Sequence, residues 1–213
     1  MTDRRTIVFY VSGHGLGHAS RAIEVINALV DRCPNLHIII RSSVAPWLVE
    51  RTARAGVKLS PVEVDTGIIQ LDSLHLDAPA SIARAEAFMS TFDARVATEV
   101  QFLREHRAVL AVSDLPPLGI AAANAARIPA VASGNFTWDW IYAHYESGEN
   151  LASQIGAIYR NTTIALRLPM WGGFEIKVPE NWSVSGRVTP ILGGYEDKTR
   201  PPRDAFLRLT VRG

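Results

Sequence analysis

A glycine-rich segment near the start of the chain carries the residues best suited to chemistry. Residues 12–18 read SGHGLGH and directly follow the apolar run 7–11. The three glycines are Gly13, Gly15 and Gly17. Without a Cβ they let the backbone turn sharply and approach a ligand closely. The free N–H groups of a helix that starts near His18 would face the same opening and favour phosphate, carboxylate or a developing alkoxide. The segment therefore predicts a cradle for an anion or a sugar.

Two imidazoles belong to this opening. His18, at the helix start, can act as a base or a hydrogen-bond donor toward a sugar hydroxyl or a phosphate, because imidazole titrates near neutral pH. The alternative is that it caps the helix and orders the loop, and for His14 this ordering role is the one we favour. Their spacing of four would suit a zinc pair on a helix, but Gly15 and Gly17 argue against a helix there. We expect no metal.

Polar side chains also follow two later predicted strands. Asp114 lies in the loop 113–117, where it can accept hydrogen bonds from sugar hydroxyls or act as a base. The alternative is structural, since Asp before two prolines is a common way to leave a strand and start a helix. Asn135 and Asp139 lie at the mouth of a third loop, 133–139. The predicted substrate-binding residues are Gly13, His14, Gly15, Gly17, Asp114, Asn135 and Asp139, and the predicted catalytic residue is His18.

The elements that must position these loops alternate along the chain. Apolar runs typical of strands occur near 6–12, 36–42, 57–64, 108–113, 129–133 and 163–168, and helical patterns near 18–31, 46–55, 79–106, 117–126 and 137–160. This alternation predicts an α/β, Rossmann-like three-layer domain with a mostly parallel sheet. In such a sheet the loops at the carboxyl ends of the strands converge, so the three polar loops should meet.

Helical spacing separates residues of the core from residues of the surface. In the first helix Ala22, Ile23 and Ile26 belong to one apolar stripe, whereas Arg21 is expected to face outward. Trp138, Ile141, Tyr142 and Tyr145 also follow helical spacing. We therefore expect these aromatic side chains to be structural rather than a stacking platform for sugar.

Composition limits the classes of partner. The chain has 213 residues, 47% hydrophobic and 20% charged, with a formal net charge of +1, which gives no reason to expect nucleic acid. Its single cysteine, Cys33, excludes an internal disulfide and fits a reducing compartment. No run approaches the ~20 apolar residues of a transmembrane helix, and 7–11 is too short for the core of a signal peptide. We expect a cytoplasmic protein.

The composition changes after about residue 186, where prolines and glycines interrupt any regular pattern. This change predicts a Rossmann-like domain over 1–186, and a linker with the start of a second domain over 187–213.

Three segments together resemble a known family. Residues 12–21, 112–117 and 134–142 look like motifs of the N-terminal half of GT-B-type glycosyltransferases. The strongest likeness is to the glycosyltransferase-like domain at the front of L-arabinokinases and of related bacterial proteins, and it covers about 6–195. The first loop is also similar, more distantly, to the Gly-Gly-His loop of lipid-linked GlcNAc transferases.

The resemblance implies a function. In the complete enzymes this domain binds the acceptor, and a second Rossmann-like domain binds the nucleotide sugar. Gly13, Gly15 and Gly17 would then border the interdomain cleft, and His18 would match the histidine regarded as the base. The implied reaction is transfer of a sugar from a nucleotide-diphosphate donor to a hydroxyl acceptor, with no metal or other cofactor.

The same resemblance leaves the catalytic role open. A nucleotide sugar would bind only with a second domain or subunit, which this chain is expected to lack. The alternative is a non-catalytic sugar-binding or regulatory module, as at the front of a sugar kinase such as L-arabinokinase. An exposed cleft face would also favour a homodimer.

Overall fold

A six-stranded parallel sheet organises the molecule. The structure is a computed structural model, and it describes residues 4–168. The strands are β1 (Arg5–Val11), β2 (Leu36–Ser42), β3 (Lys58–Pro61), β6 (Ala108–Asp114), β7 (Ala130–Gly134) and β8 (Ile164–Arg167). Their order in the sheet is β3-β2-β1-β6-β7-β8, and all neighbouring strands are parallel. The strand order reverses between β1 and β6, which is the Rossmann-like arrangement that the sequence predicted.

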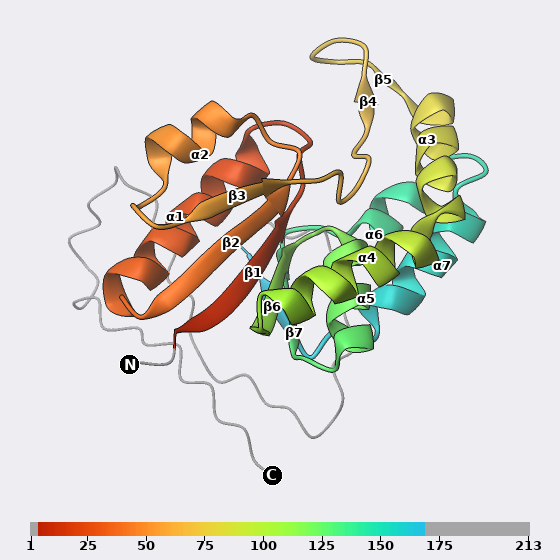
Figure 1. The fold of residues 1–213 in the computed structure, drawn as a ribbon. Helices are drawn as coiled ribbons and strands as arrows, with labels where there is room; N and C mark the ends of the chain where they lie inside the picture. The colour runs from red at the N-terminus through yellow and green to blue at the C-terminus, as the bar shows by residue number, and fades with distance from the viewer. Residues whose placement is uncertain (1–3, 169–213) are drawn as a thin grey trace, which may run out of the picture.

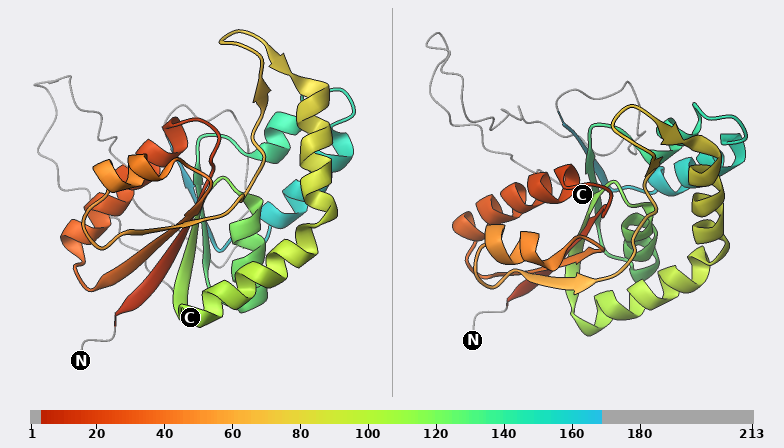
Figure 2. Two further views of the ribbon diagram at one scale, coloured as in Figure 1. Left: turned by 45° about the horizontal axis from the view of Figure 1, so that its top comes forward. Right: turned by 90° about the horizontal axis from the view of Figure 1, so that it is seen from above.

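Helices cover both faces of this sheet (Figures 1 and 2). The helices α1 (Gly17–Arg32) and α2 (Pro46–Thr52) lie on one face. The other face carries α4 (Phe92–Glu105), α5 (Pro117–Ala126) and α7 (Glu149–Tyr159), with α3 (Ala78–Ser90) and α6 (Trp138–Tyr142) beyond the carboxyl edge of the sheet. Alternation along β1 directs its side chains to two separate cores, as expected for a strand buried on both faces.

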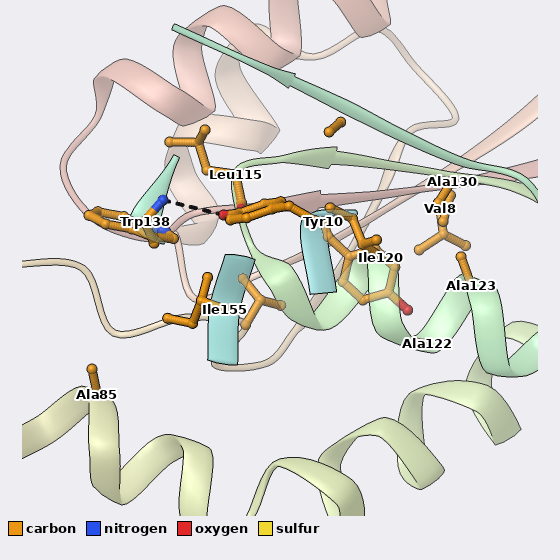
Figure 3. Close-up of a cluster of buried hydrophobic side chains, with 14 of the residues drawn as sticks. Val8, Tyr10, Ala85, Leu115, Ile120, Ala122, Ala123, Ala130, Trp138 and Ile155 are labelled. Atoms are coloured by element: carbon orange, nitrogen blue, oxygen red, sulfur yellow. Dashed lines mark hydrogen bonds between the residues drawn. The ribbon is translucent and has the colours of Figure 1, made fainter. Parts of the chain in front are cut away.

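Each core joins one face of the sheet to its own helices. Ile7 and Phe9 of β1 pack with Ile23 and Ile26 of α1, which form the stripe that helical spacing predicted. Val8, Tyr10, Ile120, Trp138 and Ile155 belong to the opposite core, which Figure 3 shows in close-up. Trp138 and Tyr142 are each 2% exposed, so the structural interpretation of these aromatic residues is confirmed.

Two predicted helices are each divided in the structure. The pattern over 79–106 forms α3 and α4, which meet at Thr91, where the backbone leaves helical geometry with φ −110° and ψ 11°. The pattern over 137–160 forms α6 and α7, separated by a turn that ends at Gly148.

A small hairpin extends beyond the sheet and was not predicted. It pairs β4 (Ile69–Gln70) with β5 (Leu76–Asp77) in antiparallel fashion and projects from the carboxyl-edge side of the molecule (Figure 1). Its turn carries Leu71, 68% exposed, and Leu74, 89% exposed.

A buried ion pair fixes α4 against the sheet. Glu99 of α4 is 1% exposed and accepts hydrogen bonds from Arg41 of β2, through Nε at 2.9 Å and through Nη2, and from the Tyr10 hydroxyl at 3.0 Å. The Arg41 guanidinium also stacks over the Phe102 ring, 4.0 Å from its centre. Burial, with the Glu99 charge beside it, raises the pKa of Tyr10 well above its ordinary value.

Two sequence expectations concern residues beyond this region. The predicted linker at 187–213 and the end of the predicted first domain, 169–186, lie outside the described residues. Within residues 4–168, no helix combines the length and the apolar character needed to span a membrane.

Candidate functional site

The candidate site lies at the carboxyl ends of β1 and β6, where the strand order reverses. Ligands collect at such a switch point, because the loops on either side of it leave the sheet in opposite directions. The two strand ends lie directly beside each other, with Val11 opposite Asp114 and the Ser12 amide 3.4 Å from the Asp114 carbonyl oxygen. The glycine-rich loop and the loop after β6 therefore meet, as predicted.

Four side chains form one hydrogen-bonded cluster there. Oδ1 of Asp114 lies 3.2 Å from Nδ1 of His18 and 2.6 Å from Nη2 of Arg21. Nε of Arg21 donates to Oδ2 of Asp114 at 3.2 Å, and Nη1 donates to Oδ1 of Asn135 at 3.1 Å. The cluster thus brings together His18, Asp114 and Asn135 from three predicted loops, and adds Arg21.

His18 is held at one ring nitrogen and open at the other. Its side chain is 12% exposed, and the Phe136 ring meets it edge-on at 5.6 Å. Among residues 4–168, no group forms a hydrogen bond with Nε2. This atom is also not fully buried, so solvent can reach it. The capping alternative does not apply, because the residue at the N-cap of α1 is Leu16 and no side chain caps it. The imidazole is therefore oriented through Nδ1, and Nε2 is the ring nitrogen that a ligand could reach.

Asp114 owes its position to a strained turn. It ends β6 with 4% exposure, and the next residue, Leu115, has a φ of +78°. That region is costly for a leucine, and here the Tyr159 hydroxyl holds it by donating to the Leu115 carbonyl oxygen. The residue at the N-cap of α5 is Pro116, without a side-chain bond, so Asp114 does not cap that helix. Both carboxylate oxygens are instead committed to His18 and Arg21.

The glycine-rich loop takes its shape from two of its glycines. A Cβ on Gly13 would lie 2.0 Å from the Ser43 hydroxyl and 3.2 Å from the Ser43 Cβ, so a larger residue would force the Ser43 side chain in the loop after β2 to move. Gly15 has a φ of +70°, and a Cβ on either Gly15 or Gly17 would meet no atom of residues 4–168 within 4 Å. Both therefore border open space beside the cluster.

His14 lies within the loop but outside the hydrogen-bonded cluster. Its ring meets Trp138 edge-on at 6.2 Å and packs against Gly67, where an added Cβ would come within 2.6 Å of the ring. Burial, reinforced by the neighbouring His18 and Arg84, lowers the pKa of His14 below its ordinary value. The side chain is thus held mainly by packing.

Asp65 is a buried carboxylate beneath the loops. It lies between β3 and the hairpin, is 8% exposed, and accepts hydrogen bonds from the Ser12 hydroxyl at 3.0 Å and from Nε1 of Trp138 at 2.9 Å. The Ser12 oxygen in turn accepts the His14 amide at 3.3 Å. Desolvation raises the pKa of Asp65 to about 6, although both hydrogen bonds oppose the rise. Asp65 ties the loop after β1 to α6.

Asp139, one of the predicted site residues, lies apart from the hydrogen-bonded cluster. It lies in the first turn of α6 and packs toward α7, where a Cβ on Gly156 would approach its Oδ2 to 3.0 Å. Its Oδ1 is buried without a hydrogen-bond partner among the described residues. Asp139 therefore belongs to the α6–α7 contact rather than to the cluster.

Sequence reasoning did not select Arg21 or Asp65 for the site. Arg21 was expected to face outward, but it lies three residues after His18, so both share one face of α1. That spacing could have indicated that Arg21 belongs to the site. No pattern in the sequence indicated Asp65, because an Asp-Thr-Gly stretch is typical of an ordinary turn. Among residues 4–168, no group of three or more His, Cys, Asp and Glu side chains is placed to hold a metal.

Comparison with solved structures identifies the fold. The described residues form a Rossmann-like domain whose fold is similar to about half of the structure of a GT-B glycosyltransferase. Phytolacca americana UGT2, complexed with UDP-2-fluoro-glucose and pterostilbene, superimposes with a TM-score of 0.50 and 11% identity, over 77% of this chain and 48% of UGT2. Acinetobacter baumannii MurG is similar over 82% of this chain and 45% of its own, with 12% identity and a TM-score of 0.46.

A sequence relative gives a more particular likeness. The chain is 32% identical to L-arabinokinase of Arabidopsis thaliana over 169 residues, which are 76% of this chain. The match spans 16% of the length of that relative. No family model matches the sequence. The resemblance to L-arabinokinase and to GT-B glycosyltransferases that the sequence motifs indicated is thus confirmed.

Proposed function

We propose that this domain binds the acceptor in transfer of a sugar from a nucleotide-diphosphate donor to a hydroxyl group. The observation that carries the proposal is His18, whose Nδ1 faces Asp114 while Nε2 opens to solvent at the switch point of the sheet. When Nδ1 carries the ring proton, Nε2 has a lone pair and can accept the proton of a hydroxyl group that lies within hydrogen-bond reach. The nucleotide sugar would be supplied by a second domain or subunit.

Each residue of the cluster has a part in the proposed transfer. Nε2 of His18 takes the acceptor proton, and the acceptor oxygen forms a bond to the anomeric carbon of the donor sugar. The bond from that carbon to the diphosphate breaks, and the nucleoside diphosphate leaves with the electron pair. Asp114 orients the imidazole through Nδ1 rather than meeting the acceptor. Asn135, whose amide nitrogen has no hydrogen-bond partner among residues 4–168, binds an acceptor hydroxyl.

The glycine-rich loop has a supporting part. Open space beside Gly15 and Gly17 lets a ligand approach the first turn of α1, where unpaired backbone N–H groups favour a developing negative charge. His14 lines the same loop. No step in this scheme requires a metal, since proton transfer and orientation come from side chains.

Substitution of His18 tests the proposal. We expect His18→Ala to lower the rate of sugar transfer by ~10²–10⁴ in the smallest form of the protein that transfers sugar. His75→Ala is the control, because that histidine lies in the hairpin with a side chain 71% exposed. A rate within a factor of about two of the wild type for His18→Ala would exclude it as the base.

A non-catalytic sugar-binding module is the second candidate. The observation that favours it is the match to L-arabinokinase over only 16% of that protein. Calorimetric titration of the chain with L-arabinose and other monosaccharides would then show binding that Asn135→Ala abolishes at an unchanged melting temperature. Binding of a sugar without any transfer, with a partner domain supplied, would favour this candidate over the first.

The predicted homodimer also remains a proposal. Its support is the exposed leucines of the hairpin, Leu71 and Leu74. Light scattering of the chain over a range of concentrations distinguishes monomer from dimer.

A further inference from the structure

Nδ1 of His18 has two neighbours, and each requires a different protonation state of this nitrogen. Oδ1 of Asp114, at 3.2 Å, can only accept, so it requires a proton on Nδ1. Nη2 of Arg21, at 3.3 Å, can only donate, so it requires a lone pair on Nδ1. A neutral imidazole carries one proton, so the two contacts exclude each other. Whichever neighbour prevails decides whether Nε2 carries the lone pair or the proton.

The geometry favours Arg21. Its Nη2 has two N–H groups, so it can donate to Asp114 and to His18 at the same time. Its contact to Oδ1 of Asp114 is 2.6 Å, against 3.2 Å for His18. Nε of Arg21 engages the second carboxylate oxygen, so the guanidinium compensates the charge that would otherwise draw the imidazole proton to Nδ1.

We propose that Arg21 is a positioning residue that keeps the ring proton of His18 on Nε2 in the unliganded protein. In this state His18 is a hydrogen-bond donor toward the open site. It becomes a base only when the guanidinium releases Nδ1 to Asp114. Asn135 stabilises the resting arrangement, because it holds Nη1 of Arg21 on the far side of the guanidinium. The catalytic meaning of this arrangement rests on the proposed transferase function, but the tautomer itself does not.

Nitrogen NMR of the unliganded chain tests the proposal. In the 213-residue protein labelled with ¹⁵N-histidine, long-range ¹H–¹⁵N spectra distinguish a protonated ring nitrogen from one with a lone pair. Spectra are recorded at about pH 8, above the ordinary range of imidazole, and His18→Gln identifies the signals. The wild type is expected to show the proton on Nε2. Arg21→Met is expected to move it to Nδ1, where Asp114 is then the only partner.

Two further variants make the result specific. Arg95→Met is the matched control, since the Arg95 side chain is 32% exposed against 30% for Arg21 but lies on α4. It should leave the His18 signals unchanged. Asp114→Asn should keep the proton on Nε2, because Arg21 still donates to Nδ1. Thermal melting of each variant shows that it is folded.

The opposite pattern would overturn the proposal. A wild-type proton on Nδ1, or His18 signals that are the same in wild type and in Arg21→Met, would show that Asp114 rather than Arg21 sets the tautomer. Because no substrate is present, failure here is distinct from failure of the transferase proposal, which is judged by the rate of His18→Ala.

Discussion

Replacing Asp65 with asparagine should remove a pH dependence of stability that arises from one buried carboxyl group. Burial raises the pKa of Asp65 from 3.8 to about 6 in the folded protein. Folding therefore favours the protonated form of this group. The stability that Asp65 contributes is fully present below about pH 3.8 and is lost as the pH rises through about 6.

The magnitude follows from the size of this shift. A change of about two pH units corresponds to ~3 kcal/mol of stability, at 1.36 kcal/mol for each unit. Linkage places about 2 kcal/mol of this loss between pH 4 and pH 7. The asparagine side chain in Asp65→Asn has no such titration. Its carbonyl oxygen can accept from Trp138 and its amide can donate to the Ser12 oxygen, so both contacts are kept, with the direction of the Ser12 hydrogen bond reversed.

Denaturant unfolding at a series of pH values measures the effect. The difference in free energy of unfolding between Asp65→Asn and wild type should shift by about 2 kcal/mol in favour of the variant from pH 4 to pH 7. The contributions of the other titrating groups cancel in this difference, because both proteins contain them. Asp93→Asn, an exposed change in the first turn of α4, is the control and should give a nearly flat difference. A flat difference for Asp65→Asn as well would refute the argument that burial disfavours this charge.

Two substitutions test how the site is supported. Gly67→Ala should destabilise the fold by about 1–2 kcal/mol and displace the His14 ring, because φ is +61° and the new Cβ would meet the imidazole. Gly56→Ala, at a φ of +93° but in open space, separates backbone strain from the contact in the same unfolding assay. Glu99→Leu should cost about 3–5 kcal/mol, since it leaves the buried Arg41 without its carboxylate. A loss below about 1 kcal/mol would mean that water reaches Arg41.

Strands and the sheet could be predicted because their signals are local. The runs at 6–12 and 108–113 are apolar on both faces, which is typical of parallel strands covered by helices on both sides. The division of 79–106 at Thr91 had no such signal. No glycine or proline interrupts that stretch around Thr91, and the apolar spacing continues through it.

The break between α6 and α7 is a different case. Ser147 and Gly148 form a dipeptide typical of turns, and Ser147 has a φ of +63°. The apolar spacing on either side of it was nevertheless continuous enough to favour one helix over 137–160.

The sequence predicted correctly which residues lie close together where a loop's position in the sheet determined its neighbours. His18 and Asp114 are 96 residues apart, yet their strands are adjacent, so topology alone brought them to one edge. Asn135 joined them for the same reason. Asp139 does not join this cluster, because its position in α6 turns its carboxylate toward α7. The order of the strands does not predict in which direction a side chain of a short helix points.

The burial of the site residues separates two layers with different roles. Asp65 and Ser12 are 8% and 0% exposed and bond to backbone and indole groups that fix the loops. Arg21, with a side chain 30% exposed, belongs with His18 to the more accessible layer, where it pairs with the Asp114 carboxylate. Changes in the lower layer should therefore alter stability and its pH dependence. Changes at Arg21 or His18 should alter the ring proton of His18 and the binding of the acceptor.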